Sequence, residues 1–130
     1  MARAVRVGVI GCGYWGPKLA RNFQALPGAE LVAVADLSPE RRAEMAAKYP
    51  DARVVADHRA LLALGVDAVA IATPVATHAR LATEALAAGC HVLVEKPLAG
   101  SSADARALVA AAQAAGRVLL VGHTFAYHPA

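Results

Sequence analysis

Three glycines near the start of the chain restrict its fold more than any other feature. Gly11, Gly13 and Gly16 have the spacing G-x-G-x-x-G and directly follow an apolar run at residues 5–10. With this spacing, the first glycine makes a tight turn and the second lets the backbone approach a pyrophosphate, while the third allows close packing of helix on strand. The pattern therefore predicts a strand, a phosphate-binding turn and a helix.

The turn is predicted to bind the pyrophosphate of a dinucleotide through backbone N–H groups. These belong to Gly11, Cys12, Gly13, Tyr14 and Trp15, and the positive end of the following helix adds to the attraction for an anion. Two roles are open for the aromatic rings of Tyr14 and Trp15. They either cover the cofactor or pack at the edge of the domain.

An acidic residue at the expected distance supports the dinucleotide interpretation. Asp36 closes the next apolar run, about 20 residues after Gly16. Its carboxylate can accept hydrogen bonds from both hydroxyls of the adenosine ribose, and it repels a 2′-phosphate. We therefore predict NAD as the cofactor in preference to NADP. Arg41 and Arg42 argue in the other direction, because an arginine near this position can accommodate that phosphate.

Strand-like and helix-like segments alternate along the whole chain. Strands are predicted at residues 5–10, 30–36, 53–56, 67–72, 91–95 and 117–122. Helices are predicted at residues 14–26 and 39–49, from Asp57 to 64, at 77–88, and from Ser101 or Ser102 to 116. This alternation predicts an α/β fold of the Rossmann type, a doubly wound parallel sheet with strand order 3-2-1-4-5-6. Ligand is expected where the order reverses, between the carboxyl ends of the first and fourth strands.

Length and composition limit the remaining possibilities. The 130 residues suffice for one domain, which we assign to dinucleotide binding over residues 1–130. The net charge of +3 is scattered and forms no basic stripe, so nucleic-acid binding is not indicated. The longest charge-poor stretch, residues 60–73, is too short and too interrupted to span a membrane.

The N-terminus lacks a signal-peptide pattern, and the expected location is the cytoplasm. Cys12 and Cys90 are expected to be reduced, buried thiols, and no metal site is predicted.

Two later loops are expected to face the same crevice as the glycine turn. Thr73 and Pro74 follow the fourth strand, and Lys96 follows the fifth. Lys96 is a cation that can orient a substrate hydroxyl or assist the transfer of its proton, although an exposed lysine at a strand end is also common. From its position alone, His78 is expected to be a cap or surface residue rather than a ligand.

Taken together, these motifs resemble one known family. The stretches Val9 to Gly16, Ala72 to His78, Glu95 to Pro97 and Gly122 to Phe125, in this order, are similar to the N-terminal domain of the Gfo/Idh/MocA oxidoreductases, the group of glucose–fructose oxidoreductase and inositol dehydrogenase. The resemblance covers nearly the whole chain, and its most specific element is Glu95-Lys96-Pro97.

The resemblance implies an NAD(P)-dependent sugar or cyclitol dehydrogenase. Lys96 would lie near the nicotinamide and the substrate as the catalytic residue. The residues that would line the cofactor cleft are Thr73, Pro74, His78, Glu95, Lys96 and Pro97. The glycine-turn and Gly-His-Thr-Phe stretches are also similar to members that oxidise the 3-hydroxyl of UDP-N-acetylglucosamine-type sugars. Val75 departs from the family, since many relatives have Asn there.

Length is the larger departure from the family pattern. Family members continue into an α/β domain that supplies most substrate contacts, a catalytic His or Asp, and usually the oligomer interface. Here that domain would begin at about residues 123–130. We therefore expect a piece of a longer, homo-oligomeric enzyme rather than a free-standing cofactor-binding domain. Alone, the chain is expected to bind NAD without turnover, and to expose an apolar patch near its sixth strand.

Two other functions are compatible with the glycine turn. A non-catalytic nucleotide-sensing module would need the glycines and Asp36 but would have no use for Lys96. A Rossmann module for coenzyme A would not need an acid at Asp36. Whichever function holds, the sequence predicts a nucleotide ligand.

Overall fold

The computed structural model describes residues 3–13 and 16–122. The strands are β1 (Val5–Ile10), β2 (Ala29–Ala35), β3 (Arg53–Val55), β4 (Ala68–Ile71), β5 (His91–Glu95) and β6 (Leu119–Gly122). The helices are α1 (Gly16–Ala25), α2 (Pro39–Lys48), α3 (His58–Leu62), α4 (His78–Ala87) and α5 (Ser102–Ala115), with a short 3₁₀ helix η1 (Val75–Thr77) before α4. Tyr14 and Trp15 lie outside the described residues, as does the predicted start of a second domain.

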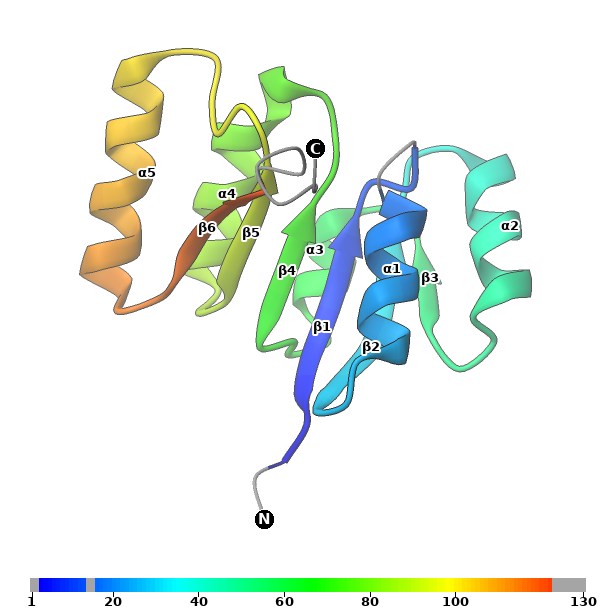
Figure 1. Cartoon of the computed structure of the whole chain (residues 1–130). Helices are drawn as coiled ribbons and strands as arrows, with labels where there is room; N and C mark the ends of the chain where they lie inside the picture. The colour runs from blue at the N-terminus through cyan, green and yellow to red at the C-terminus, as the bar shows by residue number, and fades with distance from the viewer. Residues whose placement is uncertain (1–2, 14–15, 123–130) are drawn as a thin grey trace, which may run out of the picture.

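The strands form one parallel sheet with the order β3-β2-β1-β4-β5-β6, which confirms the predicted fold class and topology (Figure 1). The last residues of the central strands are in register, since Ile10 pairs with Ala35 on one side and with Ile71 on the other. The loops that follow β1, β2 and β4 therefore start at the same level of the sheet. This is the edge where the order of the strands reverses and where ligands bind in such folds.

Helices cover both faces of the sheet, and each face has its own apolar core. On one face, α1 and α2 pack through residues such as Ala20 and Met45 against Val9 and Val34. On the other face, side chains of α3, α4 and α5 join the core; Leu61 is one of them. The carboxyl-terminal halves of β1 and β2 are buried on both faces, which explains their nearly continuous apolar sequence.

Local signals set the ends of the helices. The predicted caps are confirmed at Ser38 and Asp57, whose side chains accept from backbone N–H groups of the first helical turn. Of the two candidates before α5, Ser101 is the cap. Gly116 ends that helix in the left-handed conformation. The predicted elements agree with the observed ones to within two residues at each end that is described.

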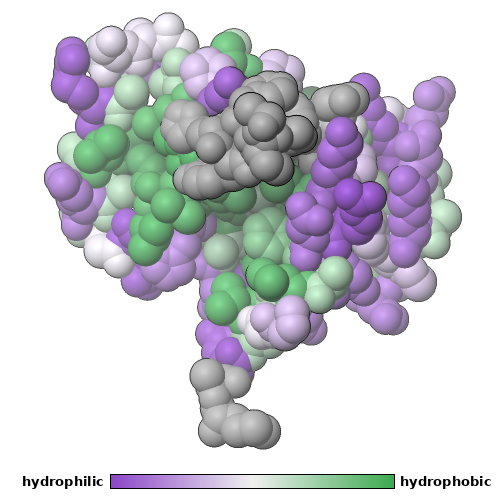
Figure 2. Space-filling view, in the orientation of Figure 1, coloured by the Kyte–Doolittle hydropathy of each residue, from purple (hydrophilic) through white to green (hydrophobic). Residues whose placement is uncertain are grey.

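One half of the sheet carries apolar surface. Val118 and Leu120, next to and within β6, are 53% and 58% exposed, and Val109 of α5 is 46% exposed. Figure 2 shows hydrophobic surface on this side of the molecule, whereas the side of α1 and α2 is largely hydrophilic. The predicted apolar patch near the sixth strand is present.

Among the described residues, no helix is long and apolar enough to cross a membrane.

A cluster of charges connects α3 to α4. Glu84 of α4 accepts from Arg59 (2.8 Å) and also contacts the ring of His58. The other ring nitrogen of His58 lies 3.3 Å from Asp57. Hydrogen bonds hold the pKa of Glu84 below its usual value, and the bond from Arg59 has a larger effect than the bond from His58. The charged form of Glu84 therefore stabilises the contact between the two helices.

We predict that Glu84→Gln lowers the free energy of unfolding by about 0.5–1 kcal/mol at neutral pH, as expected for a partly exposed ion-pair cluster. Because the pKa is lowered in the folded state, the unfolded chain takes up this proton first as the pH falls. The contribution is thus present above the ordinary pKa of a glutamate, about 4.3, and is lost below it. Urea unfolding at several pH values measures the difference, with Glu44→Gln on the exposed surface of α2 as control. A difference that persists unchanged in acid would contradict this account.

Candidate functional site

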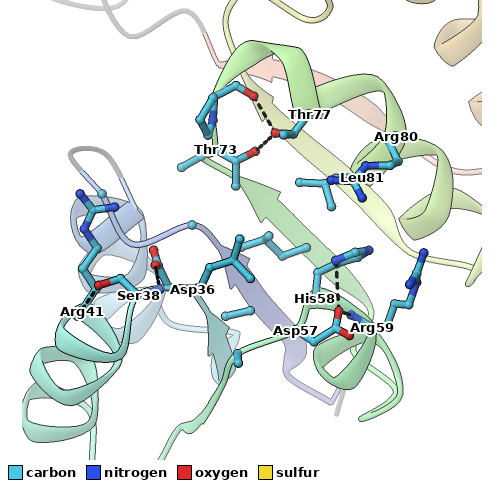
Figure 3. Close-up of a pocket in the computed structure, with 18 residues that line it drawn as sticks. Asp36, Ser38, Arg41, Asp57, His58, Arg59, Thr73, Thr77, Arg80 and Leu81 are labelled. Atoms are coloured by element: carbon cyan, nitrogen blue, oxygen red, sulfur yellow. Dashed lines mark hydrogen bonds and ion pairs between the residues drawn. The ribbon is translucent and has the colours of Figure 1, made fainter.

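A cavity of about 790 Å³ opens at the carboxyl ends of β1, β2, β3 and β4. Its lining comes from the glycine turn, from the segments after β2, β3 and β4, and from α4 (Figure 3). The lining residues are Ile10, Gly11, Gly13, Ala35, Asp36, Leu37, Ser38, Arg41, Ala56, Asp57, His58, Arg59, Ala72, Thr73, Pro74, Thr77, Arg80 and Leu81. The cavity therefore lies at the predicted switch point.

Two of the three glycines are required by the protein's own packing. Gly11 has φ +96°, and a Cβ there would lie 2.7 Å from the carbonyl oxygen of Ala72. A Cβ on Gly16 would lie only 1.8 Å from the carbonyl oxygen of Gly11. These values agree with the predicted roles of a tight turn at Gly11 and close packing of α1 on β1 at Gly16.

Gly13 is different, because the described residues leave room for a side chain at this position. A Cβ there would meet no described atom closer than the guanidinium of Arg41, at 3.5 Å, which is an ordinary contact. Gly13 also lines the cavity. The space beside its backbone thus fits a group from outside the chain, such as the pyrophosphate predicted for the second glycine of the motif.

Asp36 connects the end of β2 to the glycine turn. Its Oδ2 accepts from the backbone N–H of Cys12 (2.6 Å), and its Oδ1 accepts from that of Ser38 (2.8 Å). The carboxylate also lines the cavity. Since each carboxylate oxygen can accept more than one hydrogen bond, capacity remains for the two hydroxyls of a ribose.

Cys12 is unsuited to nucleophilic chemistry. Its side chain is buried, and burial together with the Asp36 carboxylate raises the pKa of the thiol to about 12. A thiol is reactive as the thiolate, which this environment disfavours. Burial, with a smaller effect of Asp67, also raises the pKa of Cys90, and both cysteines are free thiols as expected. The backbone N–H groups of Gly11 and Cys12, predicted to bind a pyrophosphate, donate within the protein instead, to the carbonyl oxygen of Ala35 (2.8 Å) and to the Asp36 carboxylate (2.6 Å).

The two arginines after β2 occupy different places. Arg42 donates through one guanidinium nitrogen to the carbonyl oxygens of Asp36 and Leu37. Arg41 lines the cavity beside Gly13. Of the two residues that argued for NADP in the sequence, Arg41 is therefore the one placed to meet a phosphate.

The loop after β4 forms another wall of the cavity. Thr73 and Pro74 line it, together with Thr77. The hydroxyl groups of Thr73 and Thr77 are 2.6 Å apart, and that of Thr77 also lies 2.6 Å from the carbonyl oxygen of Pro74. These bonds fold the loop back on itself at the start of α4.

His78 does not lie on the surface, contrary to what its position alone suggested. The residue is 2% exposed, and both ring nitrogens lie close to backbone carbonyl oxygens. Nδ1 is 2.9 Å from that of Pro97, and Nε2 is 2.8 Å from that of Thr73. Its predicted place in the cofactor cleft is untested, and the ring is not among the groups that line the cavity.

Glu95, Lys96 and Pro97 follow β5 at the same edge of the sheet but do not line the cavity. The backbone N–H of Lys96 donates to the carbonyl oxygen of Gly122 (3.3 Å), while Lys96 and Pro97 are exposed. The described cavity thus gathers the predicted residues of the first, second and fourth strands. The group after β5 forms a separate part of the same edge, and its role in catalysis stays a prediction.

Several cavity residues were not predicted as site residues. Asp57, His58 and Arg59 follow β3, and Arg80 and Leu81 belong to α4. The predicted strand order was the available signal, since β3 next to β2 brings the following segment to the same edge. Asp57 was interpreted only as a helix cap. Among the described residues, no three His, Cys, Asp or Glu side chains are grouped so that they could hold a metal ion.

Comparison with known proteins places this geometry among oxidoreductases. The model of the Gfo/Idh/MocA family, described as an oxidoreductase family with an NAD-binding Rossmann fold, matches residues 5–123. A 4-carboxy-2-hydroxymuconate-6-semialdehyde dehydrogenase from Sphingobium sp. is 39% identical over 96% of this chain and 40% of its own length. A UDP-N-acetylglucosamine 3-dehydrogenase from Acidithiobacillus ferrooxidans is 42% identical over 97% of this chain and 39% of its own length. The chain thus spans about two fifths of the curated relatives it matches.

Solved structures agree with the fold and contain both nicotinamide cofactors. GenD2 from gentamicin A biosynthesis, in complex with NAD, superposes with a TM-score of 0.92 at 39% identity, over 99% of this chain and 37% of its own. A variant of KijD10, a 3-ketoreductase from Actinomadura kijaniata, in complex with TDP-benzene and NADP, gives a TM-score of 0.90 at 33% identity, over 98% of this chain and 41% of its own. Similarity alone therefore leaves the choice between NAD and NADP open.

The contrast between two glycines gives a test of the turn. We predict that Gly16→Ala lowers the free energy of unfolding by about 3 kcal/mol or more, because the new methyl group overlaps a backbone oxygen. Gly13→Ala should leave stability nearly unchanged and weaken NAD binding by about tenfold or more, or ~1.4 kcal/mol. Urea unfolding and calorimetric titration of both variants measure the two effects. Equal loss of stability in the two variants, or NAD binding unaffected by Gly13→Ala, would contradict the assignment.

Proposed function

We propose that this chain, which belongs to the Gfo/Idh/MocA family of oxidoreductases, binds NAD. The binding site would be the cavity at the carboxyl ends of β1, β2 and β4. The bound cofactor would serve hydride transfer with a secondary hydroxyl of a sugar, nucleotide-sugar or cyclitol. The observation that carries this proposal is the position of Asp36. Its carboxylate is fixed by the glycine turn and faces the cavity.

The position of Asp36 supports NAD as the cofactor. Hydrogen bonds from Cys12 and Ser38 fix the carboxylate at the end of β2, where the adenosine ribose lies in Rossmann folds. A carboxylate held there accepts from ribose hydroxyls and repels a 2′-phosphate. Arg41 lies beside Gly13, the glycine whose backbone is predicted to meet the pyrophosphate, so we assign Arg41 to the pyrophosphate. NADP remains the second choice.

The chemistry assigned to Lys96 follows from the edge of the sheet on which it lies. NAD supplies a hydride acceptor, and oxidation of a secondary alcohol also releases the hydroxyl proton. We assign Lys96 to orient that hydroxyl and to assist the removal of its proton. Thr73 and Pro74 would hold the cofactor on the side of β4, and Glu95 and Pro97 on the side of β5.

The activity of the intact protein is likewise a proposal, because this chain spans about two fifths of its relatives. The names of relatives include a nucleotide-sugar dehydrogenase and a semialdehyde dehydrogenase, and we favour the sugar and cyclitol class. Hydride transfer needs the substrate held in place beside the nicotinamide. Among the described residues the cavity serves the cofactor. We further propose that the intact protein is a cytoplasmic homo-oligomer and that its substrate contacts lie outside the described cavity.

Titration of the chain with NAD, NADP and coenzyme A tests the cofactor. We expect NAD to bind most tightly. Asp36→Ala should cost about 1.5–3 kcal/mol of NAD affinity, the range for hydrogen bonds to a charged group, and should leave NADP affinity unchanged or improved. Asp51→Ala on the surface is the control. Equal loss for both cofactors would assign Asp36 to the turn alone, and preference for coenzyme A would overturn the proposal.

A second prediction concerns turnover. The chain alone should bind NAD but reduce none of it with cyclitols or UDP-sugars, because it spans about two fifths of its relatives and hydride transfer needs the sugar held beside the nicotinamide. Absorbance of NADH at 340 nm, in the presence of each substrate class, measures this. Robust NADH formation by this chain would show that the substrate site lies within it.

A further inference from the structure

His78 stands apart from the other polar residues of the protein. Among the described residues, it is the one polar or charged residue that is buried, with 2% of its surface exposed. It lies at the start of α4, directly after the loop that follows β4. A polar ring placed in an apolar core costs stability unless its nitrogens find partners. Its partners therefore indicate why a histidine occupies this position.

The two partners of the ring belong to two different loops. Nε2 lies 2.8 Å from the carbonyl oxygen of Thr73, in the loop after β4. Nδ1 lies 2.9 Å from the carbonyl oxygen of Pro97, in the loop after β5. The ring thus spans the space between the two loops and touches the backbone of each. Pro97 is also the residue next to Lys96.

The chemistry of the partners makes this a directional contact. Both are carbonyl oxygens, which only accept hydrogen bonds, and each ring nitrogen lies close to one of them. A neutral imidazole donates through one of its nitrogens, and an imidazolium donates through both. A phenylalanine ring would fill the same volume but could hold neither oxygen. The ring contacts the backbone at two points that are 24 residues apart in the sequence (97 minus 73).

We propose that His78 is a positioning residue that fixes the loop carrying Lys96 relative to the loop carrying Thr73. The residue is only 2% exposed, and both ring nitrogens lie against backbone oxygens, so we infer that it acts on the cofactor site through Thr73 and Pro97. This inference rests on the proposed function, in which the nicotinamide end of NAD lies beside Lys96. The adenosine end would lie by Asp36 and Gly13, whose neighbours are Cys12, Ser38 and Arg41 rather than His78.

The inference predicts a split between the two ends of the cofactor. ADP has the adenosine and the diphosphate but no nicotinamide, so it reports the glycine turn and Asp36 alone. His78→Phe should weaken NAD binding by about tenfold, the size expected for loss of a buried hydrogen-bonded contact, and change ADP binding by less than about twofold. A purely structural role would change the affinities for NAD and for ADP by the same factor. Calorimetric titration measures both affinities.

Two amide variants separate the two halves of the contact. The amide nitrogen of asparagine takes the place of Nδ1, and that of glutamine the place of Nε2. His78→Asn should therefore keep the bond to Pro97 and retain NAD affinity within about twofold. His78→Gln should keep the bond to Thr73 and show the loss seen in His78→Phe. If His78→Phe does not fold, the difference between these two variants tests the same point.

Hydrogen exchange of the Lys96 amide tests the contact without any cofactor. This N–H donates to Gly122 and should exchange faster in His78→Phe and His78→Gln, but not in His78→Asn. His91→Phe is the matched control. Nδ1 of His91 accepts from the backbone N–H of Val118 at the opposite end of β5, so this variant also loses a bond to backbone.

The outcomes distinguish the inference from the proposed function. Unaltered Lys96 exchange in His78→Phe and His78→Gln, or equal changes for NAD and ADP, would overturn the positioning role while NAD binding by the wild-type chain still supports the function. Failure of the wild-type chain to bind NAD would overturn the proposed function. In that case faster exchange at Lys96 would still support the contact between the loops.

Discussion

The approach of α1 to the end of β1 is the constraint on which the site depends. The helix begins so close to the strand that a single Cβ at Gly16 would lie 1.8 Å from the carbonyl oxygen of Gly11. This contact holds the start of α1 against the end of β1, at the edge of the sheet where Gly11 and Gly13 line the cavity. The in-register ends of β1, β2 and β4 then bring Asp36 and Thr73 to the same level. The close approach of Gly16 to Gly11 thus shapes the turn in the absence of a ligand.

The fold could be predicted from the sequence because its signals are local. Apolar runs mark the strands, and Ser38, Asp57 and Gly116 mark helix ends through bonds to their own neighbours. The strand order follows from the glycine motif together with the alternation of elements. The same reasoning gave the three roles of the glycines, and it indicated Asp36, because each depends on a short stretch of chain.

The rest could not be predicted because it depends on distances between elements far apart in the sequence. His78 contacts Pro97 across the gap between two loops, and Glu84 meets Arg59 across two helices. Neither pair has a pattern in the sequence, since each helix could rotate or shift by a few ångströms without changing its residues. The different places of Arg41 and Arg42 have the same origin. Adjacent positions on α2 point in different directions, and the structure decides which of them reaches the cavity.

The two halves of the sheet differ in what they offer to a ligand. The half around β1 and β2 is covered by helices on both faces and holds the cavity, in which the Asp36 carboxylate is fixed by hydrogen bonds from Cys12 and Ser38. The half around β5 and β6 carries Lys96 and the exposed side chains of Val118 and Leu120. Rossmann domains share the first half across many functions, because it recognises a nucleotide and not a reaction. In the proposed function, the reaction is distinguished at the second half, where Lys96 lies. The buried ring of His78 contacts the backbone of the loop after β4 and of the loop after β5.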